Sequence, residues 1–382
     1  MNTFVYADKF FMKSGTVGPG YLEITNGVFG KFSKERPNNA TDILDYSGQW
    51  IGPGLVDTHI HGFKNHDVMD NDAEGLKKMS EALLSCGVTS FLPTTLTSSR
   101  ERLKAVAETI GRTADKVTGA KIQGIYFEGP FFTEKYKGAQ NPSYFSDPNI
   151  DVFNEWQEAS GGLIKKIALA PERDGVSEFV EAITKDGVVV ALGHSDASME
   201  DAQEAVMSGA SVFVHTYNAM RGLNHREPGM VGAAMTLHNV FCELICDGHH
   251  VHPEAAGLLV NQKGHDHIAL ITDCMMAGGM PDGNYMLGEF PVVVENNTAR
   301  LKEGNLAGSI LKLKEAIKNV VDWEIATPEQ AVMMASLVPA ISCKIDDKCG
   351  SLTEGYPADF IVLSKKMNLK ATYLDGICRY EV

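Results

Sequence analysis

Two histidines separated by one residue, His59 and His61, stand in the run DTHIHG at residues 57–62. In a β-strand alternate side chains share a face, so both imidazoles are expected to point the same way. Neutral imidazole is a common nitrogen ligand of divalent metals. Taken alone, the pair fits a metal site and a solvated pair of side chains equally well.

Four more polar residues each end an apolar run that is typical of a buried strand: Glu128, His194, His215 and Asp273. A hydrogen-bonded polar residue at a strand end would explain any one of them. It does not explain six imidazole and carboxylate groups together, because clustering them without a cation is costly. The donors therefore predict a divalent metal centre, with zinc as the first choice and iron, manganese or cobalt as alternatives.

Short apolar strands that alternate with amphipathic helices must position these residues. We expect strands at residues 54–59, 88–92, 121–127, 164–170, 188–193, 211–215, 240–246 and 267–273. Between most of them, apolar residues recur at three- and four-residue spacing, as on a helix face. Eight such units predict an α/β protein with a (β/α)8 TIM-like barrel, whose active site lies at the carboxyl ends of its strands. A doubly wound open sheet is the alternative.

Both ends of the chain have strand character. The first 50 residues alternate apolar and polar residues and contain Asn26-Gly27, a hairpin signal, and the tail returns to the same pattern. We predict a small β-sandwich domain from residues 1–50 and 346–382, beside a barrel formed by residues 51–345. Residues 281–308 are expected to form a hairpin inserted after the eighth strand.

The composition narrows the function classes. The chain has 382 residues, 44% of them hydrophobic, which suffices for a large core and excludes disorder. Its net charge of −15 argues against nucleic-acid and anionic-membrane partners. No apolar run is long enough for a membrane span, and the amino terminus does not resemble a secretory signal. The seven scattered cysteines contain no C-x-x-C pair and indicate reduced thiols, so we expect a cytoplasmic protein.

Over essentially its whole length the chain resembles the amidohydrolase superfamily and, within it, the N-acetylglucosamine-6-phosphate deacetylase family. The motifs are PGLVDTHIHG from residue 53, EGP at 128–130, GHS at 193–195, HTYNAM at 215–220, REPG at 226–229, DG at 247–248, TD at 272–273 and GYPADF at 355–360. The H-x-H and the closing motif mark only the superfamily. The pairing of HTYNAM with REPG is much more specific to the deacetylases.

The resemblance implies metal-dependent hydrolysis of the acetamide of N-acetylglucosamine 6-phosphate, which gives glucosamine 6-phosphate and acetate. It implies a primary metal held by Glu128, His194 and His215. His59 and His61 would supply a second metal position, so that one or two ions bind per subunit, and Asp273 would act as general base and acid. The predicted fourth strand ends in LAPE at 169–172, without the lysine that bridges two metals in other branches, so Glu128 would take the bridging role.

The substrate contacts that the resemblance implies are Gln140, Asn218, the Ala219 backbone amide, Arg226 and His250. An arginine fork matches phosphate oxygens, and the resemblance places Arg226 at a homodimer interface, where it reaches the neighbouring active site. A surface ion pair between Arg226 and Glu227 is the alternative. Gln140 stands where family members often have a histidine, so it can donate a hydrogen bond but carries no charge.

Two other functions stay open. One is deacetylation of another phosphorylated N-acetylhexosamine, such as N-acetylgalactosamine 6-phosphate, which differs at one sugar hydroxyl. The other is a non-catalytic scaffold with an amidohydrolase fold. The complete set of ligand positions and Asp273 argue against the scaffold, whereas nothing in the sequence distinguishes the two sugars.

Overall fold

The computed structural model describes residues 2–38, 40 and 42–382. Its central sheet contains eight strands, β6 (Leu55–Ile60), β9 (Val88–Thr95), β11 (Ile125–Phe131), β12 (Ile164–Leu169), β13 (Val189–Leu192), β14 (Val212–Phe213), β15 (Phe241–Leu244) and β16 (Ile268–Leu270). Each pairs in parallel with the next in this order. A parallel bridge between Ile60 and Cys274 links the last strand to the first. The predicted barrel is confirmed.

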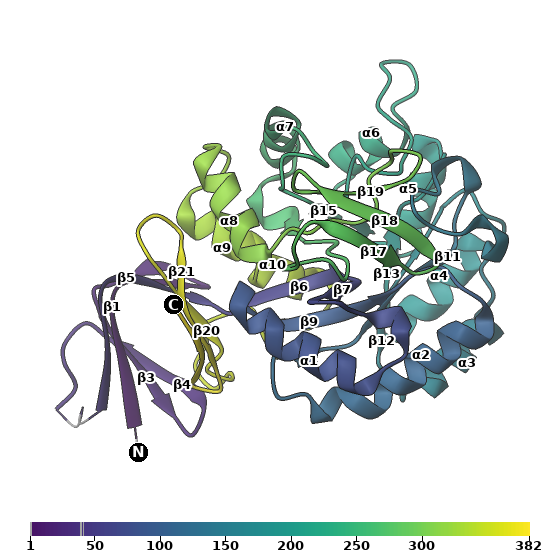
Figure 1. Ribbon diagram of the computed structural model, residues 1–382. Helices are drawn as coiled ribbons and strands as arrows, with labels where there is room; N and C mark the ends of the chain where they lie inside the picture. Colours follow the sequence, from purple (N-terminus) through teal and green to yellow (C-terminus); the bar gives the residue numbers. More distant parts are fainter. Residues whose placement is uncertain (1, 39, 41) are drawn as a thin grey trace.

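Helices surround the barrel (Figure 1). They are α1 (Ala73–Leu83), α2 (Arg100–Thr113), α3 (Ile150–Ala159), α4 (Val176–Lys185), α5 (Met199–Met207), α6 (Gly229–Thr236), α7 (Pro253–Lys263), α8 (Leu313–Asp322), α9 (Pro328–Met334) and α10 (Leu337–Ser342). On α4 the buried residues Val176, Phe179, Val180 and Ile183 recur at helical spacing, so one face packs on the strands. Ser198 begins α5 with a capping box. Among the described residues, no helix is long and apolar enough to cross a membrane.

The two chain ends form one eight-stranded sheet beside the barrel (Figure 1). It contains β1 (Asn2–Met12), β2 (Gly15–Val17), β3 (Gly20–Thr25), β4 (Val28–Ser33), β5 (Asp42–Pro53), β20 (Phe360–Leu363), β21 (Leu369–Leu374) and β22 (Ile377–Glu381). Strand β5 joins the ends, because it pairs with both β1 and β20. The sheet folds back on itself: Ala358 N donates to Gly27 O at 2.8 Å, and the Phe29 and Phe360 rings pack with centroids 6.2 Å apart. A sandwich-like core results.

The insertion after the eighth barrel strand has three strands, β17 (Gly283–Leu287), β18 (Phe290–Glu295) and β19 (Thr298–Leu301), in one antiparallel sheet. The prediction of a simple hairpin was therefore wrong in its strand number. Asn296 and Asn297, with φ of 51° and 61°, make a second tight turn. Two consecutive residues with positive φ suit a two-residue hairpin loop, and asparagine tolerates that conformation better than most residues.

Candidate metal centre and active site

The six sequence-predicted metal and acid–base residues all lie at the carboxyl end of the barrel. His59 lies in β6 and His61 follows that strand, while His194 and His215 stand two residues beyond β13 and β14. Asp273 lies three residues beyond β16. Glu128 differs from the expectation, because β11 continues to Phe131 and Glu128 lies inside the strand rather than at its end.

Glu128 is the centre of the cluster. Its Oε1 lies 3.2 Å from Nε2 of both His194 and His215. His59 Nε2 is 3.4 Å from the same oxygen, and His61 Nε2 is 3.2 Å from Oε2. The ligand atoms therefore form two groups, Glu128 with His194 and His215, and Glu128 with His59 and His61. The shared carboxylate is placed as a bridging ligand would be.

Asp273 faces the second of these groups. Its Oδ1 lies 3.1 Å from His61 Nε2 and 3.4 Å from His59 Nε2. Asp273 and His194 have φ of 49° and 48°, a left-handed conformation that non-glycine residues rarely adopt. Such strain costs on the order of 1–3 kcal/mol per residue and is concentrated at functional sites.

Opposite charges control the protonation of the buried cluster. Burial opposes ionisation of Glu128, but His59, His194 and His215 outweigh it and hold the pKa of this carboxyl well below its usual range. Burial likewise opposes the charged form of His59, yet Asp273, Glu128 and Glu243 raise its pKa to about 9. The pKa of His61 is raised well above its usual value by Asp273 and Glu128 against the effect of burial. A divalent ion would have to displace protons from these imidazoles.

The outer nitrogens of the histidines are positioned for metal ligation. His61 Nδ1 lies 3.2 Å from the Thr94 carbonyl oxygen, and His194 Nδ1 lies 3.0 Å from the carbonyl oxygen of Tyr136. Donation from Nδ1 leaves Nε2 free to bind a metal. His59 Nε2 is buried and finds no hydrogen-bond partner in the described part of the chain. A cation would satisfy that atom, so the residues present fit a divalent metal.

Gln140 is brought into contact with the cluster. Its side chain is buried, and its Nε2 donates to Glu128 Oε2 at 2.6 Å. Its Oε1 accepts from the Thr97 backbone N at 2.8 Å, which fixes the direction of the amide. Sequence reasoning missed Thr97. No signal in the sequence marks a backbone donor of this kind.

The other predicted substrate contacts lie on neighbouring loops. Asn218 and Ala219 follow His215 directly, and Asn218 Nδ2 donates to the His215 carbonyl oxygen at 3.3 Å. His250 lies in the loop after β15, where its Nδ1 is 2.7 Å from Asp247 Oδ2.

Arg226 is not brought to the cluster within this chain. It belongs to the exposed segment 222–227, in the long connection between β14 and α6, where a loop protrudes from the barrel (Figure 1). The alternative ion pair between Arg226 and Glu227 is also wrong, because Glu227 Oε2 pairs with Arg221 Nη2 at 2.9 Å. Leu223 in the same segment is 56% exposed.

Two charged residues inside the barrel were missed. Lys166 lies within β12 and Glu243 within β15, and both are buried. The fourth strand does end without a lysine, as the sequence indicates, but it carries one farther back. A charged residue in the middle of an apolar strand, as in FCELIC at residues 241–246, was the available signal.

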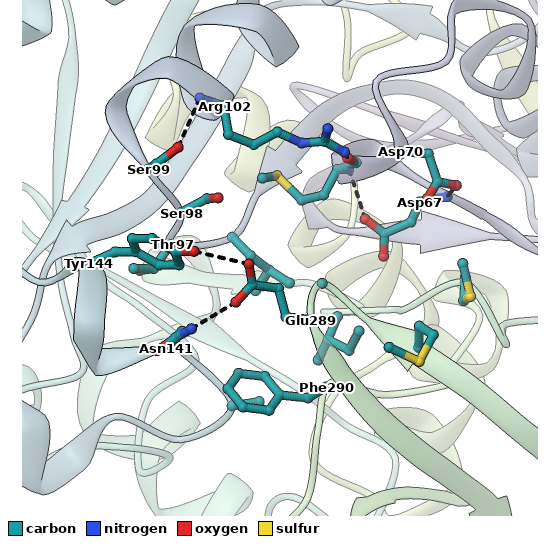
Figure 2. Close-up of a pocket in the computed structure, with 17 residues that line it drawn as sticks. Asp67, Asp70, Thr97, Ser98, Ser99, Arg102, Asn141, Tyr144, Glu289 and Phe290 are labelled. Carbon is teal, nitrogen blue, oxygen red and sulfur yellow. Dashed lines mark hydrogen bonds between the residues drawn. The ribbon is translucent and has the colours of Figure 1, made fainter.

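A cavity of about 380 Å³ lies between the inserted sheet and the loops after β9 and β11 (Figure 2). Glu289, in the β17–β18 turn, accepts from Tyr144 Oη at 3.0 Å and from Asn141 Nδ2 at 2.7 Å. The insertion is thereby tied to the loop that carries Gln140. Thr97 lines this cavity and contacts Gln140, so one residue separates the cavity from the cluster.

A barrel whose carboxyl end holds a histidine–carboxylate cluster is the architecture of metal-dependent hydrolases. The model of the amidohydrolase family matches residues 50–378, and the chain belongs to this family. The members of this family are metal-dependent enzymes.

Among curated relatives, the chain is 41% identical over 352 residues to N-acetylglucosamine-6-phosphate deacetylase of Vibrio furnissii, which covers 92% of this chain and 88% of that protein. It is 35% identical over 371 residues to N-acetylgalactosamine-6-phosphate deacetylase of Escherichia coli O157:H7, with 97% of each chain covered.

Solved structures agree with these relatives. A complex of the deacetylase from Mycobacterium smegmatis with N-acetyl-D-glucosamine-6-phosphate superposes with a TM-score of 0.94 at 27% identity, over 99% of both chains. N-acetylglucosamine-6-phosphate deacetylase of Thermotoga maritima gives a TM-score of 0.90 at 29% identity, over 99% of this chain and 100% of that one.

Proposed function

We propose that the protein is a metal-dependent deacetylase that hydrolyses the acetamide of N-acetylglucosamine 6-phosphate to glucosamine 6-phosphate and acetate. The convergence of four histidines and Asp273 on the buried Glu128 carries this proposal. The sequence relatives identify the substrate class, and the cluster supplies groups suited to amide hydrolysis.

Glu128, His194 and His215 would hold the primary ion, and His59 and His61 would hold a second ion together with Glu128. When bound, a divalent ion lowers the pKa of a water ligand and polarises a carbonyl oxygen. Nitrogen and oxygen donors favour zinc, with iron, manganese or cobalt as alternatives.

Asp273 would take the proton of the attacking water and deliver it to the leaving nitrogen. Burial alone would raise its pKa, but His59 and His61 lower it, so the carboxylate is ionised and can accept a proton. Gln140 would hold Glu128 through one N–H of its amide. The second N–H remains available to the substrate carbonyl.

The phosphate would be bound by Asn218, the Ala219 backbone amide, His250 and an arginine from outside the chain. We propose a homodimer in which Arg226 of a second copy reaches the site. The exposed Arg226 and Leu223 on one protruding segment support a contact with another protein surface. Sedimentation should give twice the monomer mass of 41.5 kDa, and a monomer would contradict this arrangement.

Two further assignments belong to this proposal. We divide the chain into a β-sandwich domain of residues 1–50 and 346–382 and a barrel domain of residues 51–345, supported by the pairing of β5 with β20. A cytoplasmic location, inferred from the cysteine content, also remains a proposal.

The relative from Escherichia coli O157:H7 favours N-acetylgalactosamine 6-phosphate as a second candidate substrate. Acetate release should be measured with both phosphorylated sugars and with unphosphorylated N-acetylglucosamine. We expect the highest kcat/KM with N-acetylglucosamine 6-phosphate and the lowest with the sugar that lacks phosphate. A higher value for the galactosamine compound would change the substrate, and no release from any of them would reject the deacetylase.

A further inference from the structure

The interior of the barrel contains a buried ion pair below the cluster. Lys166 Nζ pairs with Glu243 Oε1, and their side chains are 0% and 1% exposed. The Lys166 ammonium also lies 3.9 Å from the centre of the Tyr126 ring. Lys166 comes from the fourth barrel strand and Glu243 from the seventh, which are not neighbours, so the two side chains meet across the interior.

Glu243 connects this pair to the cluster. Its Oε2 lies 3.1 Å from His59 Nδ1, and the same oxygen accepts from the His215 backbone N at 3.3 Å. Lys166, Glu243 and His59 therefore form a continuous chain of polar contacts that runs from the barrel interior to the cluster. All three side chains are at most 1% exposed.

Burying two charges in a barrel core is expensive, and replacement of such a pair by apolar residues of similar volume is often neutral or stabilising. Barrel interiors are ordinarily filled by branched apolar side chains. Stability alone therefore does not account for Lys166 and Glu243, and their contact with His59 suggests what does.

Glu243 fixes the state of the His59 ring. Because Glu243 accepts from Nδ1–H, the His59 Nε2 lone pair is left facing Glu128 and Asp273, each 3.4 Å away. A carboxylate on the outer nitrogen also makes an imidazole a stronger ligand. His61 and His194 contact neutral backbone carbonyls at the corresponding atom, so the carboxylate distinguishes His59 from them.

We propose that Glu243, held by Lys166, is a positioning residue that makes His59 a metal ligand and so allows the site to bind a second ion. Lys166 supplies the counter-charge that keeps Glu243 a carboxylate directed at His59. This inference rests on the two metal positions of the proposed function. It adds what determines whether the second one fills.

The test compares zinc binding by the purified protein and by a double variant, Lys166→Met with Glu243→Leu. The double variant removes both charges and leaves neither partner buried alone. Zinc content is measured after saturation and desalting, and zinc affinity is measured by calorimetry. Lys165→Met, a change of the half-buried lysine next in the same strand, is the matched control. Glu243→Gln keeps an acceptor for His59 but removes the charge.

We expect two zinc ions per chain in the wild-type protein and in the Lys165→Met variant. The double variant should keep its melting temperature and its first ion, and should bind the second about 10–100-fold more weakly. Glu243→Gln should give an intermediate affinity. In nitrogen NMR spectra of the metal-free proteins, the Nδ1–H tautomer of His59 should be lost in the double variant.

A wild-type protein that binds one ion at saturation would overturn the inference, as would a folded double variant with unchanged affinity for both ions. If the double variant fails to fold, an unchanged second affinity in Glu243→Gln would overturn it instead. Zinc binding does not depend on turnover. Selective loss of the second ion, in a protein that releases no acetate, would therefore support the inference while rejecting the deacetylase.

Discussion

The metal cluster and the segment 222–227 are two parts of one proposed site, but they differ in construction. Every side chain in the cluster is at most 12% exposed and touches another member of the cluster. The residues of the segment are all exposed, and Arg226 is held there through its backbone N, which donates to Asn224 Oδ1 at 3.0 Å.

The difference separates chemistry from recognition. Groups that act on reacting atoms need fixed geometry, and strand ends inside a barrel provide it. Electrostatic interactions are also stronger in this buried environment, whereas an exposed charge is screened by salt. A global charge of −15 leaves attraction of an anion to a few local groups such as Arg226.

Asp273→Asn should give the largest effect. The amide cannot accept the proton of the attacking water, so kcat should fall by about 10²–10⁴-fold. Metal content should stay the same, because the three primary ligands are intact. Acetate release and metal analysis measure both quantities, with the exposed Asp282→Asn as control. Full activity in Asp273→Asn would contradict the assignment.

Zinc affinity of the cluster should fall as the pH decreases from 8 to 6. His59 has a pKa raised to about 9, and that of His61 is raised as well, so the metal-free site binds protons that zinc must displace. One displaced proton per ion corresponds to a loss on the order of 100-fold over this range. Calorimetric titration at several pH values measures it. A pH-independent affinity would show that the imidazoles are not ligands.

Gln140→Leu keeps the approximate size of the side chain but removes the donor to Glu128 Oε2. We expect kcat/KM to fall about 10–100-fold, the usual effect of removing a group that orients a metal ligand. Gln140→Glu should lose more, because it places a second carboxylate against Glu128. The control is Gln262→Leu on the exposed face of α7. Unchanged kinetics in both Gln140 variants would remove this residue from the site.

Arg226→Ala should give the smallest effect and change a different quantity. The KM for the phosphorylated sugar should rise about tenfold, equivalent to about 1.4 kcal/mol, with kcat nearly unchanged. Arg226→Lys should recover part of this loss, and high salt should reduce the difference from wild type. His225→Ala is the matched control in the same segment. The same rise in KM with the unphosphorylated sugar would mean that Arg226 does not contact phosphate.

Much of this site follows from the sequence because strand geometry is regular. His59 and His61 share a face by alternation, and polar residues after parallel strands must converge at one end of a barrel. Thr97 could not be predicted, since its contribution is a backbone N–H. Lys166 and Glu243 escaped because attention to strand ends passes over charges inside strands. The place of Arg226 depends on a surface outside the chain, which no local pattern encodes.

Metal removal followed by readdition tests the central claim most directly. Acetate release from N-acetylglucosamine 6-phosphate is measured before chelation, after chelation and after reloading with zinc, iron, manganese or cobalt, while circular dichroism follows the fold. We predict a folded metal-free protein without activity, and recovery with at least one of these ions. Acetate release that persists at the original rate in metal-free protein, or that returns with none of the four ions, would contradict the account.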